Sequence, residues 1–199
     1  TTISNTLQET SLSVAKTWED QSNVWGTRPE DPENSANWQA TFLLQYSLDE
    51  GATWHWMSTD APLTGSGNGA SMTPPTNVAK LTMSSKEDSS EIVFDHLPLS
   101  AMVANDDAPG YSSVDVMYRA VEEVPGGYEV VVNPEGSDDS ETIGADALYE
   151  GYATVDVEIV TESSAGEGNS GEAAGEQTTK TFKQEFTNKL LTTSLSGAK

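Results

Sequence analysis

The period-two alternation of apolar and polar residues is the feature that most limits what this chain can fold into. In "SLSVAKTWED" (residues 11–20), Leu12, Val14 and Trp18 share one face with Lys16, whereas serine, alanine and threonine occupy the other face. Alternating or β-branched segments recur at residues 38–48, 79–85, 90–97, 113–124, 127–133, 152–161 and 180–191. Helical periodicity is hard to find, and Gly, Pro, Asn and Asp clusters separate the segments. The pattern predicts an all-β sandwich.

The charge and the amino-acid composition exclude several classes of function. The 199 residues include 9 Lys and Arg against 32 Asp and Glu, a formal net charge of -23. A surface this acidic repels nucleic acid and anionic lipid, so we expect neither as a partner. The chain has no cysteine, which excludes disulfides, thiol catalysis and cysteine-ligated metal sites. No segment is long and apolar enough for membrane insertion.

Long polar segments interrupt the strand pattern at residues 23–37, 59–77 and 162–177. None of them reads as a domain boundary, because related motifs extend along the whole chain. We therefore expect one β-sandwich domain over residues 11–192, with insertions near 59–90 and 133–178.

The two ends of the chain carry similar segments. "TTISNTL" (residues 1–7) resembles "EFTNKLL" (residues 185–191). We expect residues 1–10 to be a linker or the closing strand of a preceding repeat, and residues 193–199 to be a tail. The chain would then be a fragment of a longer protein that contains tandem repeats.

Three predicted strands place one polar residue on an otherwise mostly apolar face. Lys16 lies between Val14 and Trp18, Glu122 follows Tyr118 and Ala120, and Asn188 lies between Phe186 and Leu190. One such residue would mean little, because a strand lysine often extends its amine to solvent. An amine, a carboxylic acid and a carboxamide together, however, are the three groups that an amide-exchange reaction uses.

The chemistry of this set is amide exchange. Burial lowers the pKa of a lysine, and a neutral amine is a nucleophile. A buried glutamic acid stays protonated for the same reason and can transfer protons. The amine of Lys16 would attack the side-chain carbonyl of Asn188 and release ammonia, with Glu122 as the proton shuttle. The product would be an isopeptide bond between the first and last strands.

Several motifs resemble the CnaB-type domain, the B-repeat module of surface proteins and pilins of Gram-positive bacteria. "AKTWED" followed by "TRPE" is similar to the opening of that domain, and "IVFDHLP" to its Phe–x–x–Leu–Pro turn. "MYRAVEEVPGGYEV" resembles its Tyr–x–x–x–Glu strand, and "FTNKL" its terminal Thr–Asn–Thr strand. The motifs occur in the order of the family, from about residue 11 to residue 191.

The resemblance implies an immunoglobulin-like β-sandwich of inverse topology, of the CnaB type, that is crosslinked in its interior. It assigns the nucleophile to Lys16, the electrophile to Asn188 and the proton shuttle to Glu122, the same residues that strand alternation selects. The chain departs from the family in two respects. Lys189 stands where a threonine usually follows the asparagine, and the family's core is much shorter than this chain.

Other readings of the three residues remain open. Lys16 and Glu122 could form an ordinary salt bridge, and Asn188 could be a turn residue. Glu123 directly follows Glu122, and alternation alone keeps it out of the site.

Aromatic residues and histidines offer other candidates for function. Trp54 and Trp56 share one strand face, where they could bind sugar rings, although we favour packing against the sandwich. A metal site or a Ser–His–Asp triad would require His55 and His96, which are far apart in sequence and have no supporting context. The oxygen-rich segments 105–110 and 133–141 could bind calcium, but solvated loops explain them more simply. We therefore expect no metal or cofactor.

The sequence thus predicts a structural module rather than an enzyme. We expect a stalk or spacer in an adhesin or pilus-like protein on the extracellular surface of a Gram-positive bacterium, joined to tandem repeats of the same protein. The alternative is a ligand-binding adhesin module whose loops, above all residues 59–77 and 133–150, contact a host protein or glycan.

Overall fold

The computed structural model describes residues 7–64, 73–105, 109–131, 151–164 and 177–193, and within these residues the chain forms β-strands and no helix. One sheet has five strands: β1 (Glu9–Glu19), β6 (Ser89–Pro98), β10 (Tyr128–Val130), β12 (Glu158–Ser164) and β13 (Gln177–Leu190). A second sheet has six: β2 (Glu30–Asp31), β3 (Asn34–Ser47), β4 (His55–Trp56), β5 (Lys80–Ser85), β9 (Met117–Glu123) and β11 (Tyr152–Ala153). A separate ribbon pairs β7 (Ser100–Ala104) with β8 (Tyr111–Asp115).

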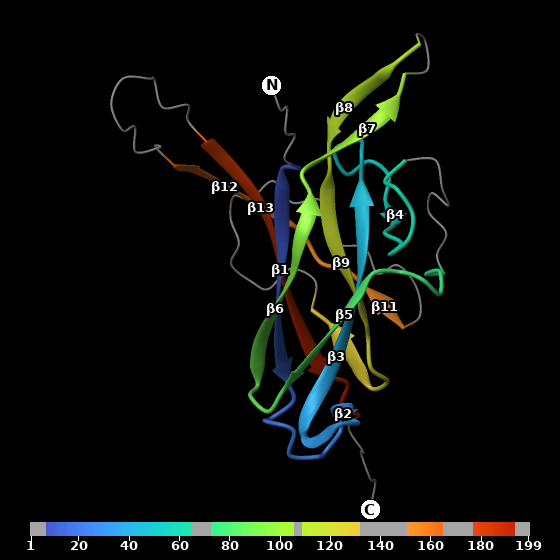
Figure 1. The fold of residues 1–199 in the computed structure, drawn as a ribbon. Helices are drawn as coiled ribbons and strands as arrows, with labels where there is room; N and C mark the ends of the chain where they lie inside the picture. The colour runs from blue at the N-terminus through green and yellow to red at the C-terminus, as the bar shows by residue number, and fades with distance from the viewer. Residues whose placement is uncertain (1–6, 65–72, 106–108, 132–150, 165–176, 194–199) are drawn as a thin grey trace, which may run out of the picture.

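Strand β1 is central in the first sheet, between β6 and β13 (Figure 1). It runs antiparallel to β6 and parallel to β13, although β1 and β13 come from opposite ends of the described chain. Parallel neighbours need a long connection, which the rest of the domain supplies. The register places Lys16 opposite Phe186 and Trp18 opposite Asn188.

Strand β3 is central in the second sheet. Trp38 pairs with both β2 and β5, and Phe42 pairs with both β5 and β9, so β2 and β9 lie along one edge of β3 and β4 and β5 along the other. The register opposes Phe42 to Glu122. Residues 117–122 are buried on both faces of β9. A strand that is covered on both faces reads as a continuous apolar run, and this explains why alternation is weaker in β9 than in β1.

The two sheets pack face to face and enclose one main core, which confirms the predicted all-β sandwich. Leu12, Val14, Phe182 and Phe186 come from the first sheet; the second contributes, among others, Phe42, Leu44, Tyr118 and Ala120. The rings of Phe42 and Phe186 meet across the core with centroids 5.2 Å apart. Burial of each large apolar side chain contributes about 1.5–3 kcal/mol to folding.

The structure divides one segment that alternation predicts as a single strand. Residues 113–124 form the end of β8 and the whole of β9, separated by the fully buried Val116. Val116 donates its backbone N–H to the carbonyl of Leu99, which ties the ribbon to the sandwich. Strand β5 falls in the expected insertion near residues 59–90 and pairs with β3.

Candidate functional site

Lys16, Glu122 and Asn188 come from three strands and meet between the two sheets. Lys16 lies on β1, Asn188 on β13 and Glu122 on β9, and all three side chains are fully buried. The strict alternation of β1 and β13 turns Lys16 and Asn188 inward, and the β9 strand brings Glu122 to them from the opposite sheet. The structure therefore brings together all three residues of the predicted site. Glu123, the neighbouring acid, is exposed.

The amine and the carboxamide approach the same carboxylate oxygen. The Nζ atom of Lys16 lies 3.2 Å from Oε1 of Glu122 and 3.4 Å from Oε2. The Nδ2 atom of Asn188 donates a hydrogen bond of 2.8 Å to Oε1. Oε1 of Glu122 is thus within 3.2 Å of both the Lys16 amine nitrogen and the Asn188 amide nitrogen.

The pKa values of the amine and the acid both shift toward the uncharged forms. Burial lowers the pKa of Lys16 from 10.5 to about 8, although the nearby Glu122 opposes the shift. Burial also raises the pKa of Glu122, against the influence of Lys16 and of the hydrogen bond from Asn188. The environment therefore favours a neutral amine beside a neutral acid more than water would.

The carbonyl oxygen of Asn188 is buried and has no hydrogen-bond partner among the described residues. Leaving a buried acceptor unsatisfied costs about 1–3 kcal/mol. Aromatic rings enclose the site: Nζ of Lys16 lies 4.4 Å from the ring centroid of Trp18, whose edge contacts are Trp38 and Tyr128. These rings help to keep water away from the three polar groups.

A second charged pair lies beyond Trp18. The guanidinium of Arg28 donates to both carboxylate oxygens of Asp20, at 2.7 and 2.5 Å, and also to Asp88 at 2.7 Å. Tyr128 donates its hydroxyl to Asp20 at 2.9 Å. The motifs "WED" and "TRPE" contain Asp20 and Arg28, but sequence reasoning assigned no role to either residue. Their pairing fixes the loop that follows β1.

Gln184 was also missed as a structural residue. Alternation placed it on the same face of β13 as Asn188. Its Oε1 accepts the backbone N–H of Ala120 at 2.5 Å, and its Nε2 donates to the carbonyl of Val155 at 2.7 Å and to the Thr154 hydroxyl at 3.2 Å. Strand β11 ends at Ala153, so backbone pairing with β9 stops there. Beyond that point the Gln184 carboxamide bridges the backbone of Ala120 in β9 and the backbone of Val155.

The tryptophan and histidine candidates have structural roles in the described residues. Trp56 is buried in a small cluster with Leu43, Val78 and Val121, and Trp54 packs against the main core, with the Arg119 guanidinium 4.3 Å from its ring centroid. This confirms the packing interpretation of both tryptophans. His55 lies against Tyr46, whereas His96 is exposed and contacts Glu9 at 2.7 Å, so the two histidines have different surroundings.

Residues 133–141, one of the calcium candidates, lie outside the described residues, as does the middle of residues 105–110. Within the described part of the chain, no group of three or more His, Cys, Asp or Glu residues is arranged to hold a metal ion. The same residues contain no helix that is long and apolar enough to cross a membrane.

Comparisons with known proteins find no relative of this chain. No protein-family model, no curated protein and no solved structure matches it. The interpretation of the site therefore depends on the chemistry of its own residues and on the motif resemblance described above.

Proposed function

We propose that this chain is a structural module that joins its first and last strands by a self-formed isopeptide bond between Lys16 and Asn188. The observation that supports this proposal is the convergence of a buried amine and a buried carboxamide on one oxygen of a buried acid. An ordinary salt bridge would explain Lys16 and Glu122, but it would leave the unsatisfied carbonyl of Asn188 without a reason.

The reaction begins with a proton transfer inside the pair. Lys16 gives one proton to Glu122, which leaves a neutral amine beside a neutral carboxylic acid. Since burial moves both pKa values in this direction, the transfer costs less here than in water. Proximity then replaces an encounter in solution, and effective molarities for well-oriented groups reach about 10⁵–10⁸ M.

The lone pair of Nζ attacks Cγ of Asn188, and the acid proton of Glu122 moves to the carbonyl oxygen. Glu122 takes one proton from the amine nitrogen and passes it to Nδ2. As the tetrahedral intermediate collapses, the hydroxyl proton returns to Glu122, the carbonyl re-forms and the Cγ–Nδ2 bond breaks. The released ammonia takes this last proton from Glu122 and departs as ammonium. One amide replaces another, so the reaction needs no oxidant, reductant or cofactor. Glu122 ends in the protonation state in which it began.

The orientation of the Asn188 amide matters for the first of these steps. Nδ2 faces Glu122, so the leaving nitrogen is already beside the proton donor. A half-turn of the amide would instead direct the unpartnered carbonyl oxygen at the protonated acid. That arrangement would satisfy the buried oxygen and polarise the carbonyl for attack.

The broader biological role follows from the motif resemblance. We propose a stalk or spacer module of inverse immunoglobulin-like topology in an extracellular surface protein of a Gram-positive bacterium, connected to further repeats. In the chain-entropy model, a covalent bond that closes a loop of this length stabilises the fold by about 5 kcal/mol. The module would not be an enzyme with turnover, because the reaction consumes its own side chains.

Intact mass under denaturing conditions tests the bond directly. We expect the purified chain to be lighter than its sequence mass by one ammonia, and the Lys16→Ala variant to have its full sequence mass. Because succinimide formation at asparagine also releases ammonia, a proteolytic digest must yield a branched peptide that joins residues 16 and 188. A full-mass, unbranched chain after prolonged incubation of the folded protein would overturn the proposal.

A further inference from the structure

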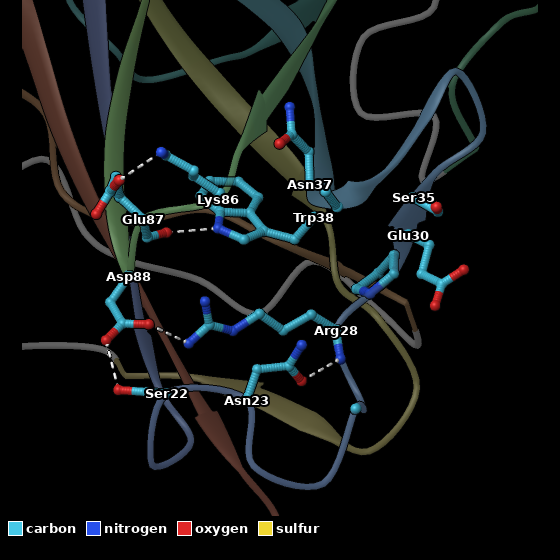
Figure 2. A pocket seen from close by; sticks show the side chains of 13 residues that line it. Ser22, Asn23, Arg28, Glu30, Ser35, Asn37, Trp38, Lys86, Glu87 and Asp88 are labelled. Atoms are coloured by element: carbon cyan, nitrogen blue, oxygen red, sulfur yellow. Dashed lines mark hydrogen bonds and ion pairs between the residues drawn. The ribbon is translucent and has the colours of Figure 1, made fainter.

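A polar pocket lies at the end of the sandwich where β1 ends and β3 begins. Its volume is about 400 Å³, and its lining includes Arg28, Glu30, Ser35, Trp38, Lys86 and Asp88 (Figure 2). The side chains come from the loop after β1, from β2, from the start of β3 and from the turn between β5 and β6. The 13 lining residues drawn in Figure 2 all belong to the described part of the chain.

The loop that forms one wall of the pocket is held in a strained conformation. Gln21, Ser22 and Asn23 have φ angles of 58°, 55° and 56°, a left-handed conformation that non-glycine residues rarely adopt. The Asn23 carboxamide oxygen accepts the backbone N–H groups of Thr27 and Arg28, and these bonds hold the loop in place. Strain of about 1–3 kcal/mol per residue persists where the surroundings enforce it, and such sites are often functional.

Several polar groups in the pocket are available to a ligand. The Arg28 side chain is only 2 % exposed and uses Nε and Nη2 on Asp20 and Asp88, which leaves Nη1 as its one group with no hydrogen bond to any described residue; Nη1 points away from Asp88 in Figure 2. The Lys86 side chain is 75 % exposed, and its ion pair with Glu87 is loose at 3.9 Å. The Glu30 carboxylate forms no hydrogen bond or ion pair within the described residues.

The charges of the pocket select against ions of either sign. Arg28 and Lys86 oppose a cationic ligand, while Glu30, Glu87 and Asp88 oppose an anionic one, as does the net charge of -23. A neutral ligand whose hydroxyl groups both donate and accept hydrogen bonds suits this mixed set. The volume lies within the range of small-molecule sites, about 300–1,000 Å³, and has room for one or two sugar rings.

A large exposed aromatic side chain lies in the same loop. Trp25 is 72 % exposed, and its loop neighbours Asn23 and Gly26 line the pocket, whereas its own side chain lies outside the lining. A rigid loop that presents an indole to solvent offers the apolar face of a pyranose ring a surface to pack on.

We propose that this pocket binds a neutral saccharide of one or two pyranose rings, with Arg28, Lys86 and Glu30 as hydrogen-bonding partners and Trp25, outside the lining, as a packing surface for the part of the ligand that extends beyond the pocket. This function goes beyond the structural role proposed above and does not need the Lys16–Asn188 bond. The residues that line the pocket do not include residues 59–64 or 73–77, the described part of one loop that the sequence suggested for ligand contact.

The test is a titration of the ¹⁵N-labelled full chain with cellobiose, maltose and lactose, followed by nuclear magnetic resonance. We expect at least one of these sugars to shift amide signals of residues 22–38 and 86–88. Lys86→Ala and Glu30→Ala, both at exposed positions, should each weaken that binding by about tenfold, the loss of one charge-assisted hydrogen bond. Trp25→Ala should weaken it as well.

Matched controls and competing ligands decide the outcome. Lys189→Ala and Glu129→Ala each remove one exposed charge, at opposed positions of the β10–β13 ladder and outside the pocket lining, and should leave sugar binding unchanged. The proposal is overturned if none of the three sugars shifts these signals. It is also overturned if trilysine or glucuronate binds the pocket more tightly than every neutral sugar. The intact mass of the same samples reports the isopeptide bond separately, so either proposal can fail alone.

Discussion

Two buried carboxamides on the same face of β13 have opposite surroundings. The Gln184 amide is hydrogen bonded at both its oxygen and its nitrogen, to Ala120, Thr154 and Val155. The Asn188 amide has one hydrogen bond, to Glu122, and an unpartnered oxygen. Lys16 is opposite Phe186, which lies midway between them, so strand register does not favour either amide as its partner.

The difference teaches that the position of the acid, rather than the spacing along the strand, selects the amide that would react. Glu122 reaches Asn188 from β9, whereas the carboxamide of Gln184 hydrogen bonds, among the described residues, only to backbone groups and a hydroxyl. A fully satisfied buried amide stabilises the fold, because every polar atom exchanges water for a protein partner. The unsatisfied carbonyl of Asn188 raises the free energy of the unreacted folded state, and it lies beside the amine and the acid that could react with it.

The largest expected effect is on the mass of the chain. Asn188→Ala should abolish the loss of ammonia completely, because the electrophile is gone. Gln184→Ala should leave the loss of ammonia unchanged, because its amide has no role in the bond. Mass spectrometry of both variants under denaturing conditions checks this contrast, and a Gln184→Ala chain of full mass, if folded, would show that the wrong amide had been assigned.

The next effect is on thermal stability through Glu122. Glu122→Gln keeps the shape of the side chain but removes its acid proton, so the chain should fold without forming the bond. The loss of about 5 kcal/mol should lower the melting temperature by about 10–20 °C for a domain of this size. Calorimetry measures the shift, and intact mass of the same sample must show the full value; an unchanged mass loss would remove the proton-shuttle role.

Gln184 should matter for stability alone. Gln184→Leu leaves the Ala120 N–H and the Val155 carbonyl without their buried partner, which should cost about 3–4 kcal/mol. Chemical denaturation measures this cost, with the mass loss as an internal control. A change below about 0.5 kcal/mol would mean that the network contributes little to folding.

The pH dependence of unfolding separates a free amine from an amide at Lys16. In Asn188→Ala the amine remains, with a folded-state pKa of about 8 against an ordinary 10.5. Between these pH values the unfolded chain binds more protons, so the free energy of unfolding should rise with pH by on the order of 3 kcal/mol. The double variant Asn188→Ala/Lys16→Met lacks the amine. Subtracting its pH curve removes the contribution of the other titrating groups to the free energy of unfolding.

The wild-type chain provides the second half of the pH test. If Lys16 has become an amide, it no longer titrates, and the rise between pH 8 and 10.5 should be absent. Denaturation at several pH values measures it. A wild-type curve that rises as steeply as that of Asn188→Ala would show that the amine is still free.

The smallest effect is expected at Lys189, which departs from the family motif. Its side chain is exposed and points away from the core, so Lys189→Thr should change stability by less than about 0.5 kcal/mol. The loss of ammonia should also be unaffected. Any clear change in either measurement would mean that the residue after Asn188 influences the site from outside the core.

Sequence alone predicted the site where strand alternation is strict. In β1 and β13 only one face is buried, so the inward positions of Lys16 and Asn188 follow from their neighbours. In β9 both faces are buried, and the sequence around Glu122 also contains the buried Arg119 and Val121. Alternation still distinguished Glu122 from Glu123, because Glu123 is the one residue of β9 whose side chain is exposed to solvent.

The residues that sequence reasoning missed depend on tertiary geometry. Gln184 acquires its role only because β11 stops at Ala153 and leaves backbone groups of Ala120 and Val155 to be satisfied. Arg28 meets Asp88 only after β5 and β6 bring the turn between them alongside the loop that follows β1. Neither contact has a periodic signature in the sequence.

The parallel alignment of β1 and β13 determines how a pulling force would travel through the module. Tension applied at the start of β1 and at the end of β13 would load the ladder between them in shear. With the bond in place, tension would enter at Glu9, pass along β1 to Lys16, cross to Asn188 and leave at Leu190. Residues 17 to 187 would bear none of it, so their loops could change in length without altering how far the module extends under load.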